Sequence, residues 1–538
     1  MTWATIAVIL VLLFVIALLT VGEGILKVTA GEQGANPSNF SILPSTLGAF
    51  FGKSSVRPQF VPADAEIIHL NKGFDINLAG KAKEESIERV MVSHYIIKPT
   101  DFLGMSPIPK VLVEVGGTVK AGDPLFYDKK RPEIIYCAPV SGELTEIRRG
   151  EKRLINAIVI LADKEVQYKK TELLVGADSK REEIVSVMTQ NGLWPYLRQR
   201  PYDMVPEPLS TPNAIFVSTF DTAPLSPNLN LAVAGKEDAF LKGIEILTKL
   251  SGSQVHLGLS ANQSKPADAY LKAAEMNGVS SHWFNGPHPA GNVGIQMHHT
   301  APVLSGTQMW YTDVHGVIVI GQFFLHGIYD TERVVALTGS VLSNPRYVKV
   351  HQGASVQQLL EDMSSDFEMK ASWIKKDGKN VQENVEQRVM RIISGDVLSG
   401  KQIERSGSLG FYDDQITVVK EGNYYEMFGW LLPQTSHPTQ SRTFTSAAFS
   451  DLEFEADTNT NGEKRAFVMT GEYESVLPMD IYPQHLFRAI MCNDLEKMEG
   501  LGILELGEED VALCEYVCTS KQPLQAMLRE GLETMRNS

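Results

Sequence analysis

Cysteine is scarce in this sequence. Only four cysteines occur among 538 residues, namely Cys137, Cys492, Cys514 and Cys518. A secreted domain held by disulfides carries cysteines at a much higher density. The scarcity therefore excludes a disulfide framework and indicates a reducing compartment. We interpret Cys514 and Cys518 as small buried apolar residues of a helix or strand.

Blocks of positive charge and phosphate-binding motifs are also missing. The chain has 49 Lys and Arg against 64 Asp and Glu, a net charge of −15. No Lys/Arg-rich block occurs, so we expect no nucleic-acid partner. Neither a P-loop nor a G-x-G-x-x-G turn is present, and the sequence therefore offers no motif for binding a dinucleotide.

A long apolar run stands at the start of the chain, from Thr2 to Gly22. At about 1.5 Å per helical residue, it suffices to cross a hydrocarbon core of about 30 Å. A signal peptide is the alternative, but no Lys or Arg precedes the run and no clear cleavage pattern follows it. We predict a transmembrane helix at residues 1–22 and a flexible linker at 23–64. The basic residues that follow place the body on the cytoplasmic side of the inner membrane.

The remaining sequence indicates an α+β multidomain protein. Short β-type runs between Gly and Pro predict a β-rich domain at residues 65–168. Helical patterns that alternate with apolar strands such as "GVIVIGQF" predict an α/β domain at 169–345. A strand, turn and helix pattern predicts a β-grasp domain at 346–430. Residues 431–538 show mostly helical patterns.

Within the β-rich domain, "VGGTVKAGDPLF" and "APVSGELTEI" resemble the paired halves of the barrel-sandwich hybrid in biotinyl and lipoyl domains. Such carriers need an exposed lysine at the tip between the halves. Counting back from Pro139 places Arg131 at the tip, and a slip of one residue would place Lys130 there. A guanidinium cannot take the acyl bond that a lysine amine can take. A structural scaffold is therefore favoured over a swinging-arm carrier.

Longer motifs follow one another from Leu70 to the C-terminus: "LNKGFDINLAG", "FNGPHPAGNVGIQMH", "ISGDVLSG", "GWLLP", "LPMDIYPQHLFRAI" and "LGILELGEEDVALCEYVC". Together they resemble the A subunit of the bacterial sodium-translocating NADH:quinone reductase. The resemblance implies a peripheral subunit of a membrane complex that oxidises NADH, reduces a ubiquinone-type quinone and pumps Na⁺ outward. It also implies five partner subunits, chiefly the B subunit in the membrane, and these partners carry the FAD, FMN, riboflavin and iron–sulfur centres. For the 346–430 domain it implies an SLBB-like β-grasp fold.

The chain is also similar to the flavin- and NADH-binding subunit of respiratory complex I, in which a glycine-rich loop approaches the flavin phosphate. Here the corresponding stretch, Asn191 to Pro201, carries Trp194, Pro195 and Tyr196. The relative also holds an iron–sulfur cluster with closely spaced cysteines, normally four per cluster. The cysteines of this chain are too few and too scattered for such a cluster. We therefore expect no cofactor, no metal and no catalytic residue in this subunit itself.

The stretch "SHWFNGPHPAGNVGIQMHHT", residues 281–300, concentrates four histidines with glycines and prolines. A zinc site is one interpretation, although an extended segment would point His298 and His299 to opposite faces. A phosphate loop is another, although two prolines remove backbone donors. The prolines and glycines instead predict a rigid loop, with His288 at its apex, that serves as a packing junction or a partner contact.

Our hypothesis is that this loop contributes to the quinone-side interface with the B subunit, where His288 would hydrogen-bond a quinone carbonyl. A purely structural histidine is the alternative. The candidate interface consists of Gly286, Pro287, His288, Pro289, Gly291 and His298.

Further acidic residues invite a functional interpretation. Asp221 in "STFDTAP" could face a ligand crevice, but the sequence is also a good turn, which we favour. The run Glu505, Glu508, Glu509 and Asp510 is typical of a solvated face without a role in transport. Two other functions stay open: a membrane-tethered lipoyl-like carrier or binding protein, recognisable by an adduct on Lys129 or Lys130, and an independent NADH dehydrogenase, recognisable by bound flavin.

Overall fold

A computed structural model describes the chain in eight stretches: residues 57–172, 179–262, 264–360, 367–376, 379–424, 438–440, 452–468 and 471–538. The predicted transmembrane helix and most of the predicted linker lie outside these stretches. Within them, no helix is both long and apolar enough to cross a membrane. By their contacts the residues divide into two units, and every helix and strand discussed below belongs to the unit formed by residues 63–430 and 455–538.

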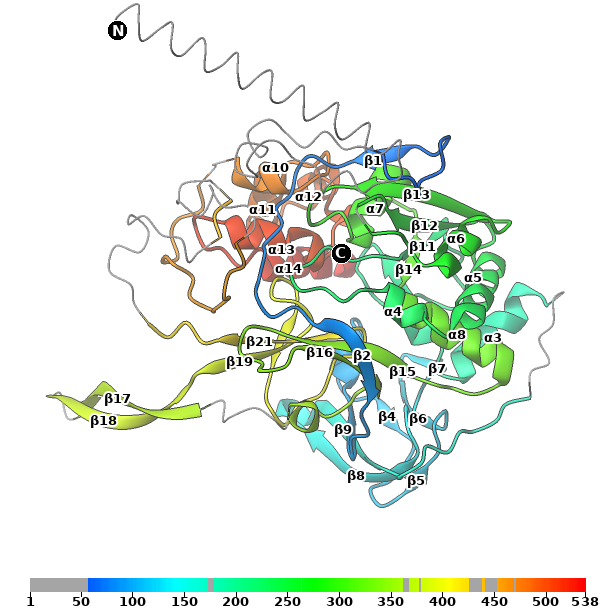
Figure 1. Cartoon of the computed structure of the whole chain (residues 1–538), viewed down its shortest axis with the longest axis horizontal. Helices are drawn as coiled ribbons and strands as arrows, with labels where there is room; N and C mark the ends of the chain where they lie inside the picture. Colours follow the sequence, from blue (N-terminus) through cyan, green and yellow to red (C-terminus); the bar gives the residue numbers. More distant parts are fainter. Residues whose placement is uncertain are drawn as a thin grey trace, which may run out of the picture. The chain divides into compact units, whose positions relative to one another are not determined.

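The β-rich domain is built from two small sheets, ordered β3-β9-β8-β5 and β4-β6-β7. Glycines at positive φ, such as Gly116 and Gly122, make the tight turns between short strands. Leu125, Phe126 and Ile134 are fully buried in its core. The elements are β3 (His94–Ile97), η2 (Pro99–Asp101), β4 (Lys110–Val111), β5 (Thr118–Val119), β6 (Pro124–Asp128), β7 (Arg131–Cys137), β8 (Gly142–Arg149), η3 (Glu151–Arg153) and β9 (Ile155–Ala162) (Figure 1).

Two strands within the range 65–168 predicted for this domain pair with other sheets instead. β1 (Ile67–His69) pairs in parallel with β13 at the edge of the α/β sheet. β2 (Lys83–Arg89) pairs in parallel with β16 of the β-grasp sheet. The segment between residues 67 and 89 therefore ties the α/β and β-grasp domains together before the chain enters the barrel.

The α/β domain has one six-stranded sheet, ordered β1-β13-β12-β11-β14-β10, in which only β10 runs antiparallel to its neighbour. The crossover from β13 back to β14 puts α7 on the face opposite α5 and α6 (Figure 1). The elements are α3 (Arg181–Gln190), η4 (Trp194–Tyr196), β10 (Arg198–Arg200), β11 (Ala214–Ser218), α4 (Asn230–Val233), α5 (Glu237–Ser251), β12 (Gln254–Ser260), α6 (Asp268–Ala274), β13 (Val279–Asn285), α7 (Val293–Thr300), β14 (Met309–Thr312) and α8 (Val314–His326).

The prediction of a strand at "GVIVIGQF" is wrong, because these residues form the middle of α8. The Oδ1 atom of Asp313 accepts a hydrogen bond of 2.7 Å from Gly316 N and caps the helix. Gly327 ends it in the left-handed conformation. A Cβ atom on Gly321 would overlap Ala239 O of α5, so the two helices are in backbone contact. The apolar run is buried on all sides, which removes the periodicity that identifies a helix.

The β-grasp domain has a second six-stranded sheet, ordered β2-β16-β15-β21-β19-β20. The predicted strand, turn and helix after Pro345 are present, although the helix α9 has only four described residues. The hairpin β17–β18 extends from the sheet and pairs only with itself within the described residues (Figure 1). The elements are β15 (Glu332–Thr338), β16 (Arg346–His351), α9 (Val356–Leu359), β17 (Phe367–Lys376), β18 (Lys379–Arg388), β19 (Met390–Ser394), β20 (Lys401–Ile403) and β21 (Gln415–Lys420).

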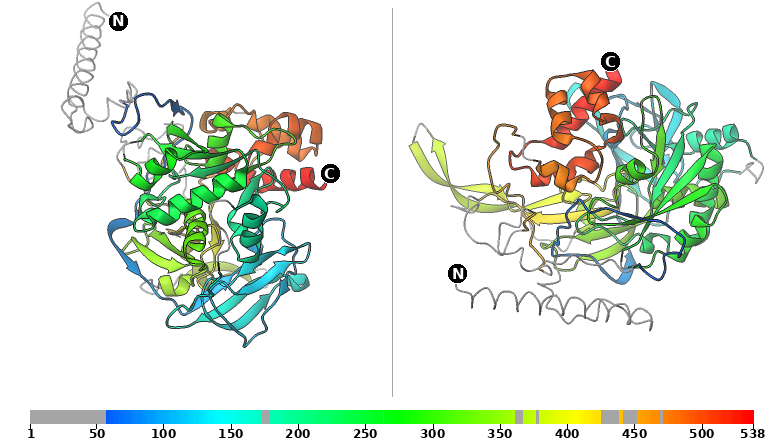
Figure 2. Two further views of the ribbon diagram at one scale, coloured as in Figure 1. Left: turned by 90° about the vertical axis from the view of Figure 1, so that its right-hand side faces the viewer. Right: turned by 90° about the horizontal axis from the view of Figure 1, so that it is seen from above.

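The C-terminal region, predicted to be mostly helical over residues 431–538, is helical from residue 472 onward, whereas the described residues 452–468 contain no helix. Pro483 occupies the first turn of α11, where its missing N–H costs no hydrogen bond. Cys514 and Cys518 are buried at α13, and the Tyr473 hydroxyl lies 2.8 Å from Cys518 Sγ. The elements are α10 (Glu472–Val476), α11 (Pro483–Met491), α12 (Leu495–Gly500), η6 (Ile503–Glu505), α13 (Glu508–Val517) and α14 (Leu524–Asn537) (Figure 2).

Candidate functional site

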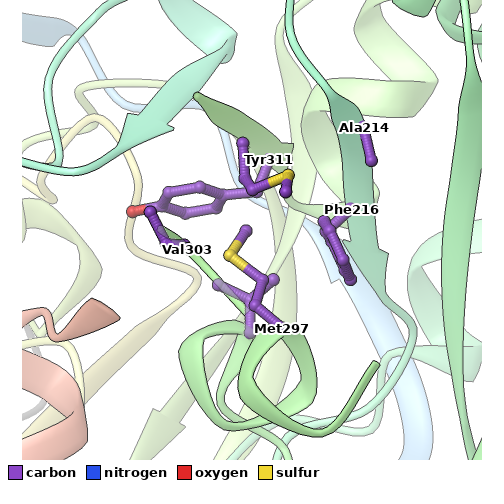
Figure 3. Packing of buried hydrophobic residues seen from close by; sticks show 7 residues of the cluster. Ala214, Phe216, Met297, Val303 and Tyr311 are labelled. Atoms are coloured by element: carbon purple, nitrogen blue, oxygen red, sulfur yellow. The ribbon is translucent and has the colours of Figure 1, made fainter. Parts of the chain in front are cut away.

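The histidine-rich stretch connects β13 to α7. Its first residues complete β13, residues 286–292 form the loop, and residues 293–300 form α7. The helix packs on the sheet through Met297, which lies against Phe216 of β11 and Tyr311 of β14 (Figure 3). This packing fixes the end of the loop at the carboxyl edge of the sheet, where α/β proteins commonly place their functional loops.

The first half of the loop is fixed by the segment 70–75. Phe74 N donates a hydrogen bond of 2.9 Å to His288 O, and His288 N donates one of 2.8 Å to Asp75 Oδ1. A Cβ atom on Gly286 would lie 2.6 Å from Leu70 O, so only glycine allows this approach. The motifs "LNKGFD" and "FNGPHPAG" therefore meet in space, although about 210 residues separate them.

His288 does not form an exposed apex, because only 4% of it is accessible to solvent. Its Nδ1 atom lies 3.2 Å from Thr222 Oγ1, which accepts a hydrogen bond from Gly291 N. Its Nε2 atom has no partner among the described residues. Burial lowers the pKa of His288 to about 4. The ring is therefore neutral at physiological pH and keeps one nitrogen free for a ligand or a water molecule.

The second half of the loop packs against the turn at Asp221. Asp221 Oδ1 accepts a hydrogen bond of 2.8 Å from Ala223 N, which is the turn favoured from the sequence. A Cβ atom on Gly291 would come within 2.7 Å of Thr222 N. This glycine is therefore required by close packing against the turn.

His298 and His299 hold the C-terminal region. Because they lie on a helix, their side chains diverge by about 100° rather than pointing to opposite faces. His298 Nε2 accepts a hydrogen bond of 3.0 Å from Asp480 N, which leaves the proton on Nδ1, 2.9 Å from Glu505 Oε2. His299 Nε2 lies 2.7 Å from Pro478 O. Both rings thus contact residues 478–505.

The histidines of this stretch do not converge on one point. His282 Nε2 lies 2.9 Å from His256 Nδ1 on the neighbouring strand, away from the other three. Across the part of the chain that the structure describes, no group of three or more His, Cys, Asp and Glu side chains could hold a metal ion. The loop is arranged as a junction between segments.

The large rings of the 191–201 stretch are buried in the same domain. Trp194 is fully buried and its Nε1 atom donates a hydrogen bond of 2.8 Å to Pro206 O. The Tyr196 hydroxyl donates to Gln352 Oε1 at 3.0 Å, and Pro195 O accepts from the Tyr412 hydroxyl at 2.8 Å. These rings are therefore core residues of the domain.

The structure contains a buried charge cluster that the sequence did not predict. The run at 505–510 is no solvated face, because Asp510 is only 1% exposed. Arg200 of β10, which is fully buried, brings Nη2 to 3.1 Å from Glu509 Oε1 and 3.4 Å from Asp510 Oδ2. A Cβ atom on Gly507 would overlap the Arg200 guanidinium, and one on Gly294 would overlap the Asp510 carboxylate. The sequence signal was a glycine directly before three acidic residues at a helix start.

The tip of the barrel is docked on the α/β domain. Arg131 is 6% exposed, and its Nη1 atom donates a hydrogen bond of 2.8 Å to Val205 O. Lys129 and Lys130 are exposed in the turn just before it. An anchored arginine next to the turn favours a structural scaffold and gives no support to a swinging arm.

Comparisons with known proteins agree with this arrangement. Three family models match the chain: the NqrA N-terminal barrel-sandwich hybrid domain at residues 68–163, the NqrA second alpha/beta domain at 179–329, and the NQRA C-terminal domain at 334–369. Among solved structures, a chain of the NAD⁺-reducing NiFe hydrogenase in its air-oxidised state gives a TM-score of 0.34 at 11% identity over 66% of each chain. A similarity this low supports no conclusion.

Curated relatives are much more similar. The A subunit of the Na(+)-translocating NADH-quinone reductase of Rhodopirellula baltica is 35% identical over 474 residues, 87% of this chain and 98% of the relative. The same subunit of Vibrio vulnificus is 35% identical over 472 residues, 87% of this chain and 99% of the relative. The chain therefore belongs to the NqrA family, the A subunits of the Na⁺-translocating NADH-quinone reductase.

Proposed function

We propose that this chain is a cofactor-free peripheral subunit that shapes the quinone side of the complex. In this proposal the flavins and iron–sulfur centres reside in five partner subunits, and a ubiquinone-type quinone is reduced while Na⁺ moves outward. The body lies on the cytoplasmic side of the inner membrane, with the N-terminal helix as its anchor. The proposal is supported by the burial of Trp194 and Tyr196, which lie in the stretch where the resemblance to the flavin-binding subunit of complex I would put a flavin loop.

The contact with the B subunit in the membrane is proposed to involve the loop of Gly286, Pro287, His288, Pro289, Gly291 and His298. The observation that carries this proposal is the free Nε2 atom of His288, which is buried, neutral and positioned by Thr222. A neutral imidazole can donate one hydrogen bond to a carbonyl oxygen, the group that a quinone presents. Since the ring is 4% exposed, the quinone would reach it only if contact with the partner moved the loop and uncovered Nε2.

The test compares complexes that carry His288→Ala or His282→Ala. His282 lies in the same stretch but pairs with His256 outside the junction, so it serves as the control. We expect His288→Ala to weaken binding of a quinone analogue by about tenfold, the loss of roughly one hydrogen bond, while the control binds normally. Unchanged affinity in a fully assembled His288→Ala complex would remove the ligand role and leave a structural histidine.

Membership of the complex is tested by co-purification from native membranes. We expect five partners and an NADH:quinone reductase activity that Na⁺ stimulates. Recovery of the chain without partners from membranes that show this activity would contradict the proposed partners.

A further inference from the structure

The buried charge cluster joins the α/β domain to the C-terminal helices. Arg198 and Arg200 come from β10, and Asp203 follows in the next turn. Glu509 and Asp510 lie in the first turn of α13. One nitrogen of Arg200, Nη2, contacts both α13 carboxylates, whereas its Nε and Nη1 atoms and Asp510 Oδ1 have no partner among the described residues. The contacts are thus concentrated on a single nitrogen.

The charges around this junction do not balance. Arg529 of α14 pairs with Glu508 through both oxygens. Lys401 of β20 and Asp313, the cap of α8, lie further out and carry opposite charges. Tyr311 and Tyr412 face Arg198 through their rings and add no charge, since burial raises the pKa of Tyr412 far above its usual value. One negative charge is therefore in excess. The four cationic groups are Arg198, Arg200, Lys401 and Arg529, and the five carboxylates are Asp203, Asp313, Glu508, Glu509 and Asp510.

Burial favours a proton on one of these carboxylates. Asp203 is held by Arg198 and by the Tyr311 hydroxyl, and Asp510 accepts a hydrogen bond of 2.9 Å from Gly507 N. Burial also raises the pKa of Asp510, but the side chain of Asp510 is fully buried, whereas that of Glu509 is 32% exposed, so a proton from solvent can reach Glu509. Burial raises the pKa of Glu509 to about 7, although Arg200 opposes the shift.

We propose that the docking of α13 on β10 depends on a proton: the C-terminal helices dock with Glu509 protonated, and loss of this proton weakens the contact. This regulation goes beyond the proposed function and does not depend on which partner the chain contacts. A carboxyl whose folded pKa lies above its usual 4.5 contributes stability at low pH. That stability is lost progressively as the pH rises from about 4.5 through about 7.

The cysteines of the chain provide the readout. Cys514 is buried on α13 and reacts with a thiol reagent only when the helix opens. Cys492 is exposed and serves as an internal reference, because both thiols become more reactive as the pH rises. The ratio of the labelling rates of Cys514 and Cys492, measured by mass spectrometry on the full chain, therefore reports the opening of α13.

We expect this ratio to rise about tenfold between roughly pH 6 and pH 8.5 in the wild-type chain. Glu509→Gln, which keeps the shape but cannot lose a proton, should make the ratio independent of pH. Glu515→Gln, the control on the same helix but outside the charge cluster, should keep the rise. A constant ratio in the wild-type chain, or a rise that persists in Glu509→Gln, would overturn the proposal.

Discussion

Glycines set the geometry of the junction at the scale of single residues. Gly294 and Gly507 lie far apart in the sequence, but each leaves room for a buried charged group of the same cluster. Both have ordinary φ angles, so their role is spatial rather than conformational. The position of Gly507 before three acidic residues is visible in the sequence, but the need for a glycine at either position is not, because it depends on what packs there.

We predict that Gly294→Ala destabilises the chain by about 1–3 kcal/mol, because its Cβ would displace the buried Asp510 carboxylate. Gly500→Ala is the matched control, since a Cβ at the end of α12 meets no atom within 4 Å. The midpoint of urea unfolding, followed through helix content, measures both. Equal midpoints for the two variants would show that the junction can shift to accept the methyl group.

His288 should make the protein sensitive to acid. Its pKa in the folded chain is about 4, below the usual 6.5, so the unfolded chain binds the proton more readily between these values. Stability should therefore fall as the pH drops from about 6.5 to about 4, by roughly 2 kcal/mol at pH 5 for this group. His288→Gln should flatten the dependence of the unfolding midpoint on pH, whereas His69→Gln, at an exposed position of β1, should not. Identical slopes in the two variants would contradict the buried neutral ring.

At the scale of elements, α8 shows why apolar content alone misleads. The run "VHGVIVIGQFF" is rich in β-branched residues and favours a strand by propensity. The structure makes it a helix because Asp313 caps its start, Gly327 ends it, and glycines at the α5 contact allow close packing. The cap and stop signals were present in the sequence, but the buried helix lacks the polar face by which helices are usually identified.

The cap gives a direct prediction. Asp313→Ala should destabilise the chain by about 1 kcal/mol, because Gly316 N loses its acceptor at the start of α8. Asp313→Asn keeps an acceptor oxygen and should cost much less. Thermal unfolding followed by circular dichroism separates the two. A loss of the same size in both variants would mean that the charge matters rather than the hydrogen bond.

At the scale of the whole molecule, the order of domains was predictable and their connections were not. Short runs with Gly and Pro turns predicted the barrel, and long motifs identified the family, which the relatives confirm. The strand pairing of β1 and β2 with distant sheets could not be predicted, because short edge strands carry little pattern of their own. A rigid loop was predicted at 286–292, but its burial against residues 70–75 and 221–223 depends on contacts that only the fold creates.

Our central proposal is that this chain has a structural role in the complex, while its partner subunits carry the redox cofactors. The visible absorption spectrum of the purified full chain, combined with extraction of flavin and iron, tests this division most directly. We predict a colourless protein whose flavin and iron contents are far below one per chain. A stoichiometric flavin or an iron–sulfur absorption band would contradict it.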